Sequence, residues 1–218
     1  MPDGRTLEAQ CVNHSVELPY GLTVAEVVSA VSDTYRLLDG VNAFLTENGF
    51  RHLEELVLGN SLSGLVSEFL VKNIASASPA LDANVKVGGH PDLLPHGRYA
   101  DGGVLKASDG IEVKASIQRG GWQGHNPEDC WVLVFRYAAG HSQESSWIPL
   151  HFVEIMCARL VKSDWSYSGR KGESRRTPTA SMTRSGVGKL RRNCLYRIPG
   201  VGVGTHRSEP TTPPPSEG

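Results

Sequence analysis

Residues 98–116, RYADGGVLKASDGIEVKAS, contain two candidate strands around a Ser-Asp-Gly turn. An Asp-Gly pair between apolar stretches is a strong hairpin signal. In the second strand Glu112 and Lys114 are two positions apart, so they point to one face while Val113 points to the other. Because the start of one hairpin strand lies opposite the end of the next, we expect Asp101 to approach Glu112 and Lys114. The stretch therefore predicts a hairpin with three charged groups on one face.

These groups suit a divalent cation. The carboxylates of Asp101 and Glu112 and the backbone carbonyl of Val113 form the all-oxygen ligand set that Mg²⁺ or Mn²⁺ prefers. Such an ion polarises a phosphate and lowers the pKa of a bound water, and Lys114 beside it can orient that water and stabilise the anion that forms. The alternative is a solvated Glu/Lys pair contributing about 0.2–1 kcal/mol. The apolar run that follows predicts a well-buried sheet, so we favour a cleft and phosphodiester hydrolysis.

The residues ADGGVL and GIEVKAS resemble the PD-(D/E)XK nuclease superfamily, which includes many type II restriction endonucleases. The resemblance covers the order helix, hairpin, strand. It implies that Asp101 takes the first metal position, that Glu112-Val113-Lys114 is the (D/E)-x-K tripeptide, and that Glu68 on the preceding helix adds an acidic group. It also implies Mg²⁺, with Mn²⁺ as a substitute, and double-stranded DNA as the substrate of a homodimer.

One position departs from the family pattern. Ala100, not proline, precedes Asp101, whereas a literal Pro-Asp occurs at Pro91-Asp92, twenty residues before Glu112. That spacing is also permitted, so Asp92 is the alternate metal ligand. We favour Asp101 because the short hairpin brings it close to Glu112, while Asp92 lies among prolines and glycines.

The rest of the chain indicates an α/β fold. Helical periodicity predicts a helix from Thr23 to a stop at Gly40, a second helix ending at Gly49, a short one to about Leu58 and a longer one from about Ser61. The apolar run CWVLVFRYA at 130–138 is typical of a central strand covered on both faces, and a further strand follows Pro149. With the resemblance, we expect a restriction-endonuclease-like core, a central mixed β-sheet flanked by helices, and a mainly helical N-terminal third.

Charge is strongly segregated along the chain. Residues 1–169 carry 12 Lys and Arg against 20 Asp and Glu, whereas residues 170–207 carry 10 against the single Glu173. This balance, from −8 to +9, suggests a polyanionic partner for the basic segment, which includes a short helix at about 183–193. The expected nucleic-acid contacts are Gln118, four residues after the lysine of the tripeptide, and the basic residues Arg170, Lys171, Arg175, Arg176, Arg184, Lys189, Arg191 and Arg192.

Composition and length set the remaining expectations. We divide the 218 residues into an arm at 1–20 (poorly ordered or an edge strand), a nuclease-like core at 21–169, a basic elaboration at 170–204 and a disordered Pro-rich tail at 205–218. Four widely spaced cysteines without a C-x-x-C pair indicate reduced thiols in a cytoplasmic protein, with no membrane segment. The sequence thus predicts a Mg²⁺-dependent DNA endonuclease of restriction or defence type. The alternative is a non-catalytic nucleic-acid-binding module that uses the basic segment.

Overall fold

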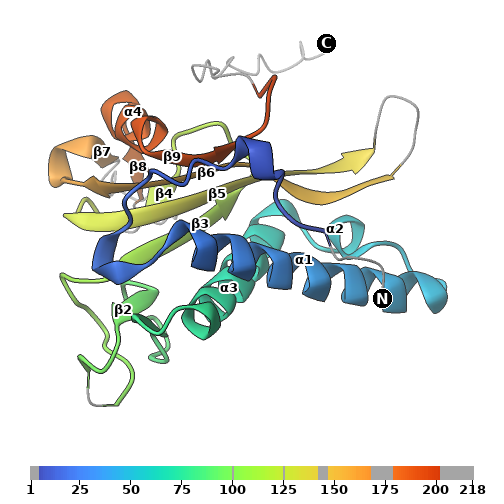
Figure 1. Cartoon of the computed structure of the whole chain (residues 1–218), viewed down its shortest axis with the longest axis horizontal. Helices are drawn as coiled ribbons and strands as arrows, with labels where there is room; N and C mark the ends of the chain where they lie inside the picture. The colour runs from blue at the N-terminus through green and yellow to red at the C-terminus, as the bar shows by residue number, and fades with distance from the viewer. Residues whose placement is uncertain (1–4, 100, 125, 142–146, 168–178, 202–218) are drawn as a thin grey trace, which may run out of the picture.

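The computed structural model describes residues 5–99, 101–124, 126–141, 147–167 and 179–201, and within them it is an α/β fold (Figure 1). A mixed six-stranded sheet has the order β1-β2-β3-β5-β6-β9. Strand β3 runs parallel to β5, and every other neighbouring pair is antiparallel. The strands are β1 (Leu81–Ala83), β2 (Leu93–Pro95), β3 (Ile111–Ser116), β5 (Cys130–His141), β6 (Trp147–Leu160) and β9 (Cys194–Arg197).

Helices α1 (Val24–Glu47), α2 (Leu53–Leu56) and α3 (Gly59–Ala77) cover one face of this sheet (Figure 1). Thr23 caps α1 through a capping box with Glu26, as its position before the apolar stripe predicts. The predicted helix end at Gly40 is wrong, because α1 continues without a break to Glu47. Beyond Gly40, the buried Asn42 of α1 joins this helix to α2, because its side-chain N–H donates to Glu54 Oε2 and its side-chain oxygen accepts from the backbone N–H of Leu53.

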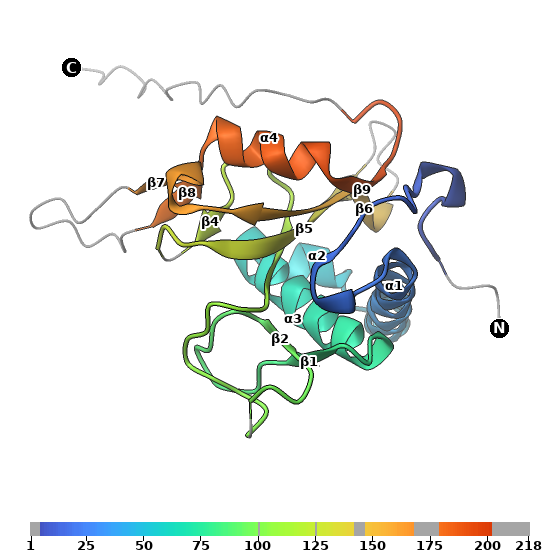
Figure 2. The same cartoon turned by 60° about the vertical axis from the view of Figure 1, so that its left-hand side comes forward.

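The opposite face carries a second, smaller layer (Figure 2). Helix α4 (Arg184–Arg192) begins at its N-cap Thr183, as the sequence predicts, and packs beside a three-stranded sheet. Val187 and Leu190 of α4 join a hydrophobic core with Val132, Val134 and Met156 of the central strands. Among the described residues, no helix has the length and apolar character needed to cross a bilayer. The small sheet consists of β4 (Gln123–Gly124), β8 (Ala180–Met182) and β7 (Trp165–Tyr167).

The prediction of a central strand at 130–138 is confirmed by β5, which lies between β3 and β6. Val132, Leu133, Val134 and Phe135 are all fully buried, because odd and even positions face the two different cores. The adjoining strand β6 pairs with β5 over most of its length, so this antiparallel pair is the main pairing of the sheet.

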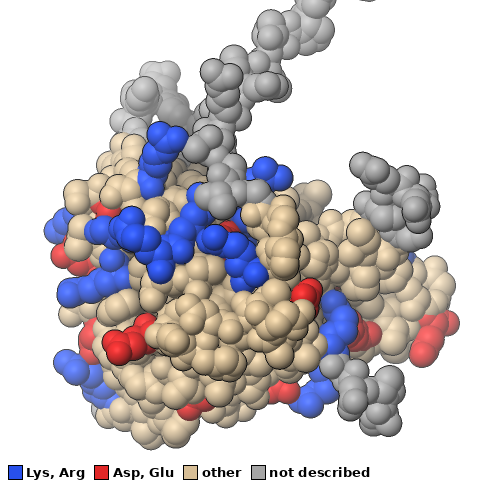
Figure 3. Space-filling model, turned by 45° about the horizontal axis from the view of Figure 1, so that its top comes forward, with Lys and Arg blue, Asp and Glu red and all other residues tan. Residues whose placement is uncertain are grey.

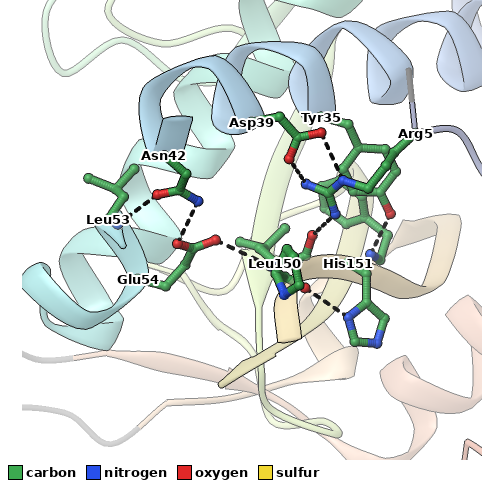
Figure 4. A network of polar contacts seen from close by, with 10 residues as sticks. Arg5, Tyr35, Asp39, Asn42, Leu53, Glu54, Leu150 and His151 are labelled. Carbon is green, nitrogen blue, oxygen red and sulfur yellow. Dashed lines mark hydrogen bonds and ion pairs between the residues drawn. The ribbon is translucent and has the colours of Figure 1, made fainter. Parts of the chain in front are cut away.

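The N-terminal segment from Arg5 is tied to the helical layer and to β6 (Figure 4). The guanidinium of Arg5 binds Asp39, donates to the carbonyl of Leu150 at 2.6 Å and lies 4.4 Å from the centroid of the Tyr35 ring. Further along, Val12 forms an isolated antiparallel bridge with Tyr196 of β9. Within residues 5–20 the arm therefore lies along β9 at the edge of the sheet, through one bridge and without forming a strand of its own.

The predicted hairpin between residues 98–106 and β3 is wrong. Residues 101–107 form no strand, and they hydrogen-bond instead to the loop after β1. Asn84 joins the two loops, because its side-chain amide donates to the carbonyls of Pro91 and Val104 and its oxygen accepts from Val104 N–H. The antiparallel neighbour of β3 is β2, through the pair Leu93 and Ile111.

Gly110 explains this change of partner. Its φ of +129° and its close approach to β2 both require glycine, since a Cβ at this position would lie 2.3 Å from the Leu93 carbonyl oxygen and 2.4 Å from Pro91 Cγ. Directly after the Asp-Gly pair, β3 therefore begins in contact with the Pro91-Asp92-Leu93 segment. This contact decides which aspartate lies beside Glu112.

Candidate active site

Asp92, Glu112 and Lys114 come together where β2 and β3 meet. Asp92 Oδ2 accepts a 2.8 Å hydrogen bond from the backbone N–H of Val113. Lys114 Nζ donates to Glu112 Oε1 at 2.5 Å, on the sheet face that also carries Val132 and Val134. Glu112 is buried, and Asp92 and Lys114 are half-buried. The three side chains thus form one shielded, charged group.

Two further side chains complete this group, and sequence reasoning did not include them among the site residues. His90 Nδ1 lies 2.8 Å from Glu112 Oε2, and His90 Nε2 lies 3.3 Å from Glu128 Oε2. His90 comes from the segment leading into β2, and Glu128 precedes β5. The only signal in the sequence was the proximity of His90 to the Pro-Asp pair, since nothing local marks Glu128.

The carboxylates of the site differ in their affinity for protons. Burial and the negative charge of Glu112 raise the pKa of Asp92 to about 7, although the hydrogen bond from Val113 and the charge of Lys114 oppose this rise. Burial alone would raise the pKa of Glu112 as well, but the proximity of His90 and Lys114 more than offsets it and lowers that pKa. Glu112 is therefore the ionised member of the pair, while Asp92 holds or loses a proton near neutral pH.

The two cations of the site are stabilised by the same carboxylates. Burial alone would lower the pKa of Lys114, but the charge of Glu112 and their hydrogen bond raise it. The pKa of His90 is raised to about 10, since Glu112 and Glu128 outweigh the effect of its burial. Both groups are positively charged at neutral pH and can neutralise an otherwise repulsive acidic cluster.

The remaining predicted residues lie apart from this group. Asp101 is exposed in a turn of the loop, and Asp92, not Asp101, lies beside Glu112 and Val113, because β3 pairs with β2 and not with residues 98–106. Glu68 is exposed on α3, and the neighbouring Ser67, not Glu68, touches β3 by accepting a hydrogen bond from Ala115 N–H. Gln118 is exposed in the loop after β3.

The predicted basic contacts fall into two sets. Lysine and arginine side chains gather in a band over α4 and β9 (Figure 3), and four of the predicted contacts belong to α4. Arg184 and Arg192 are exposed, whereas Lys189 binds Asp164 at 2.6 Å and Arg191 donates to the carbonyl of Arg119 at 2.7 Å. The other four lie outside the described residues, namely Arg170, Lys171, Arg175 and Arg176.

The donor set at β2 and β3 fits a hard divalent cation. Asp92 and Glu112 offer carboxylate oxygens next to the backbone of Val113, and Glu112 Oε2 is buried without a hydrogen-bond donor, although His90 Nδ1 is close enough for an ion pair. Within the described part of the chain, His, Cys, Asp and Glu side chains form no cluster of three or more arranged to hold a metal. The candidate site is accordingly built from two carboxylates and one carbonyl.

Comparison with protein-family models and with curated proteins gives no match. The functional argument for this chain therefore rests on its own residues and their geometry.

Proposed function

We propose that the protein is a Mg²⁺-dependent DNA endonuclease with a PD-(D/E)XK-type site, in which Asp92, Glu112 and the carbonyl of Val113 hold the ion. The observation that carries the proposal is the convergence of Asp92, Glu112 and Lys114 on one shielded position. The motif at this position reads Pro91-Asp92, then Glu112-Val113-Lys114, which is closer to the family pattern than the Asp101 assignment. The order α3, antiparallel β1, β2 and β3, then parallel β5 also supports a restriction-endonuclease-like core.

Each side chain has a separate role in this proposal. A bound Mg²⁺ would supply Lewis-acid polarisation of the scissile phosphate and a water of lowered pKa. Lys114 is protonated, so it donates N–H groups to the negative charge that develops on the phosphate and acts as an electrostatic stabiliser. His90 orients Glu112 and is itself oriented by Glu128. Because one site cleaves one strand, a double-strand break calls for a homodimer.

The test is nicking of supercoiled plasmid with Mg²⁺, with an EDTA control. We expect Asp92→Asn, Glu112→Gln and Lys114→Met each to lower the nicking rate by about 100-fold or more, since each removes a charge needed at the reacting phosphate. The matched control is Asp101→Asn, which removes the same group from an exposed turn and should leave the rate unchanged. Nicking in EDTA, or a greater loss in Asp101→Asn than in Asp92→Asn, would refute the proposal.

Metal binding can be measured without activity. If Asp92 and Glu112 hold the ion, Mg²⁺ at one hundred times its Kd should stabilise the wild type by about 2.7 kcal/mol and raise its Tm. The same addition should leave the Tm of Glu112→Gln unchanged, while Asp101→Asn responds like the wild type. Equal responses in all three proteins would place the ion elsewhere. DNA binding without any nicking or Mg²⁺ response would instead favour a non-catalytic binding module.

A further inference from the structure

A second group of charges, with Arg136 and Glu154 buried at its centre, lies on the same sheet face as Glu112 and Lys114. Arg136 of β5, Glu154 of β6 and Arg197 of β9 are direct register partners, and Ser116 of β3 continues the row. Partners across neighbouring strands share a face. Arg191, in the last turn of α4, reaches Glu154 of this row from the helix that covers this face of the sheet.

Three guanidinium groups in this row converge on one carboxylate. Glu154 is 1% exposed, and it lies 2.9 Å from Arg136 Nη1, 2.6 Å from Arg197 Nη2 and 3.9 Å from Arg191 Nε. One negative charge among three positive charges leaves a net charge of about +2. Burial of such uncompensated charge is unfavourable unless another anion completes the cluster.

The cluster also has unused hydrogen-bond donors. Among the described residues, Nε of Arg136, Arg191 and Arg197 is buried without an acceptor, and so is Nη2 of Arg197, which lies near Glu154 but is not aligned as a hydrogen bond. Arg136 is only 7% exposed, so bulk water does not satisfy its Nε. Arg197 is about one-third exposed, at 32% of its side chain, and opens the cluster to solvent. An oxygen-rich anion such as a phosphate group, whose oxygens can accept from several guanidinium N–H groups, would match these donors.

We propose that Arg136, Arg191 and Arg197, arranged around Glu154, form a phosphate-binding site. The occupant is a backbone phosphate of the bound DNA strand, a choice that rests on the proposed function. Lys114 and Arg136 are on adjacent strands and two residues apart in register, which separates their Cα atoms by about 8 Å. A strand whose scissile phosphate lies at Lys114 can therefore place a nearby phosphate over the arginine cluster.

The anion chemistry is tested with inorganic phosphate on the full chain in EDTA, so that the metal site does not contribute. We expect phosphate to raise the Tm of the wild type more than chloride does at equal ionic strength, and Arg197→Gln to weaken phosphate binding about tenfold or more. Arg197 is chosen because its partial exposure favours correct folding, which circular dichroism verifies. The control is Arg159→Gln, which removes an exposed arginine from the same strand as Glu154 but from the other sheet face. The proposed site is overturned if phosphate and chloride raise the Tm of the wild type equally. It is also overturned if Arg197→Gln and Arg159→Gln weaken phosphate binding equally.

The occupant is tested with a labelled DNA duplex in EDTA. Arg197→Gln should weaken DNA binding by at least the factor that it weakens phosphate binding, and Arg159→Gln should not. Retained DNA affinity in Arg197→Gln, together with lost phosphate binding, would assign the site to a free phosphate or nucleotide and overturn the backbone-phosphate occupant. Failure of the proposed nuclease function would appear separately, as absent Mg²⁺-dependent nicking in a wild type that still binds phosphate.

Discussion

At the residue scale, a glycine decides which aspartate lies beside Glu112. Asp101 and Asp92 were both compatible with the spacing to Glu112, and the sequence favoured Asp101 through a hairpin that does not form. Gly110 has no Cβ to prevent close contact with Pro91 and Leu93, so β3 starts on the segment that carries Asp92.

Gly110→Ala should therefore damage both stability and the site. The added methyl group would meet the Leu93 carbonyl oxygen at 2.3 Å, and we expect a loss of about 1–3 kcal/mol in the free energy of unfolding, measured by urea denaturation. Displacement of β2 should also reduce nicking, because Asp92 moves with Leu93.

The matched control is Gly97→Ala. Gly97 also has a positive φ, of +67°, but no heavy atom lies within 4 Å of the added Cβ. The Gly97→Ala variant should retain nicking, and its free energy of unfolding should fall only by the cost of backbone strain at this positive φ. Equal loss of activity in the two variants would show that backbone strain, and not the contact with β2, controls the site.

At the element scale, α4 is held against the small sheet by one buried carboxylate. Asp164, just before β7, accepts from Lys189 Nζ at 2.6 Å and from the backbone N–H of Val161 at 2.9 Å. The N–H of Thr183, the α4 N-cap, donates to the Asp164 carbonyl. Burial would raise the pKa of Asp164, but these hydrogen bonds and the charge of Lys189 lower it below its usual value.

Asp164→Asn should consequently destabilise the protein in a pH-dependent way. At neutral pH we expect a loss of about 1.5–3 kcal/mol, because a charge-assisted hydrogen bond disappears. Since the folded pKa is lowered, the stabilisation is complete above the unfolded pKa of about 4 and is lost as the pH falls through the folded value. The measurement is urea denaturation of both proteins from pH 7 to pH 3.

The control for this effect is Asp33→Asn, a half-buried aspartate paired with the exposed Arg36 on the surface of α1. Such surface pairs contribute about 0–1 kcal/mol, so this variant should differ little from the wild type. A constant difference between the wild type and Asp164→Asn down to pH 3 would contradict the assigned pKa shift.

At the scale of the whole molecule, lysines and arginines form a band over α4 (Figure 3). Glu112 and Lys114 lie on the sheet face that α4 covers, since they share that face with Val132 and Val134, which pack against α4. Lysines and arginines that contact phosphates release counterions, so the logarithm of the binding constant falls with the logarithm of salt concentration by about 0.9 per contact. The salt dependence of DNA binding therefore tests whether this basic band contacts DNA.

Substitution of Arg184 and Arg192 by Gln should reduce the magnitude of this salt slope by up to about 1.8 in DNA titrations with EDTA. Both side chains are exposed on α4, so folding should be unaffected. Arg36→Gln on α1, which covers the other sheet face, is the control and should keep the wild-type slope. An unchanged slope in the double variant would show that DNA does not cross α4.

Local sequence was sufficient for features whose cause is local. Apolar periodicity with the Thr23 cap, the short basic helix expected at about 183–193, and the buried run of β5 all correspond to elements that the structure confirms. Alternation along one strand placed Glu112 and Lys114 on a common face, since side-chain direction in a strand depends only on parity.

Tertiary structure decided everything that depended on pairing between distant segments. The choice of Asp92 over Asp101 follows from the β2–β3 contact, which a close backbone approach controls and which no local propensity encodes. His90 and Glu128 join Glu112, and three arginines join Glu154, only when loops, strands and α4 fold together. Composition indicated that the charges were present, but packing determined which of them share a buried position.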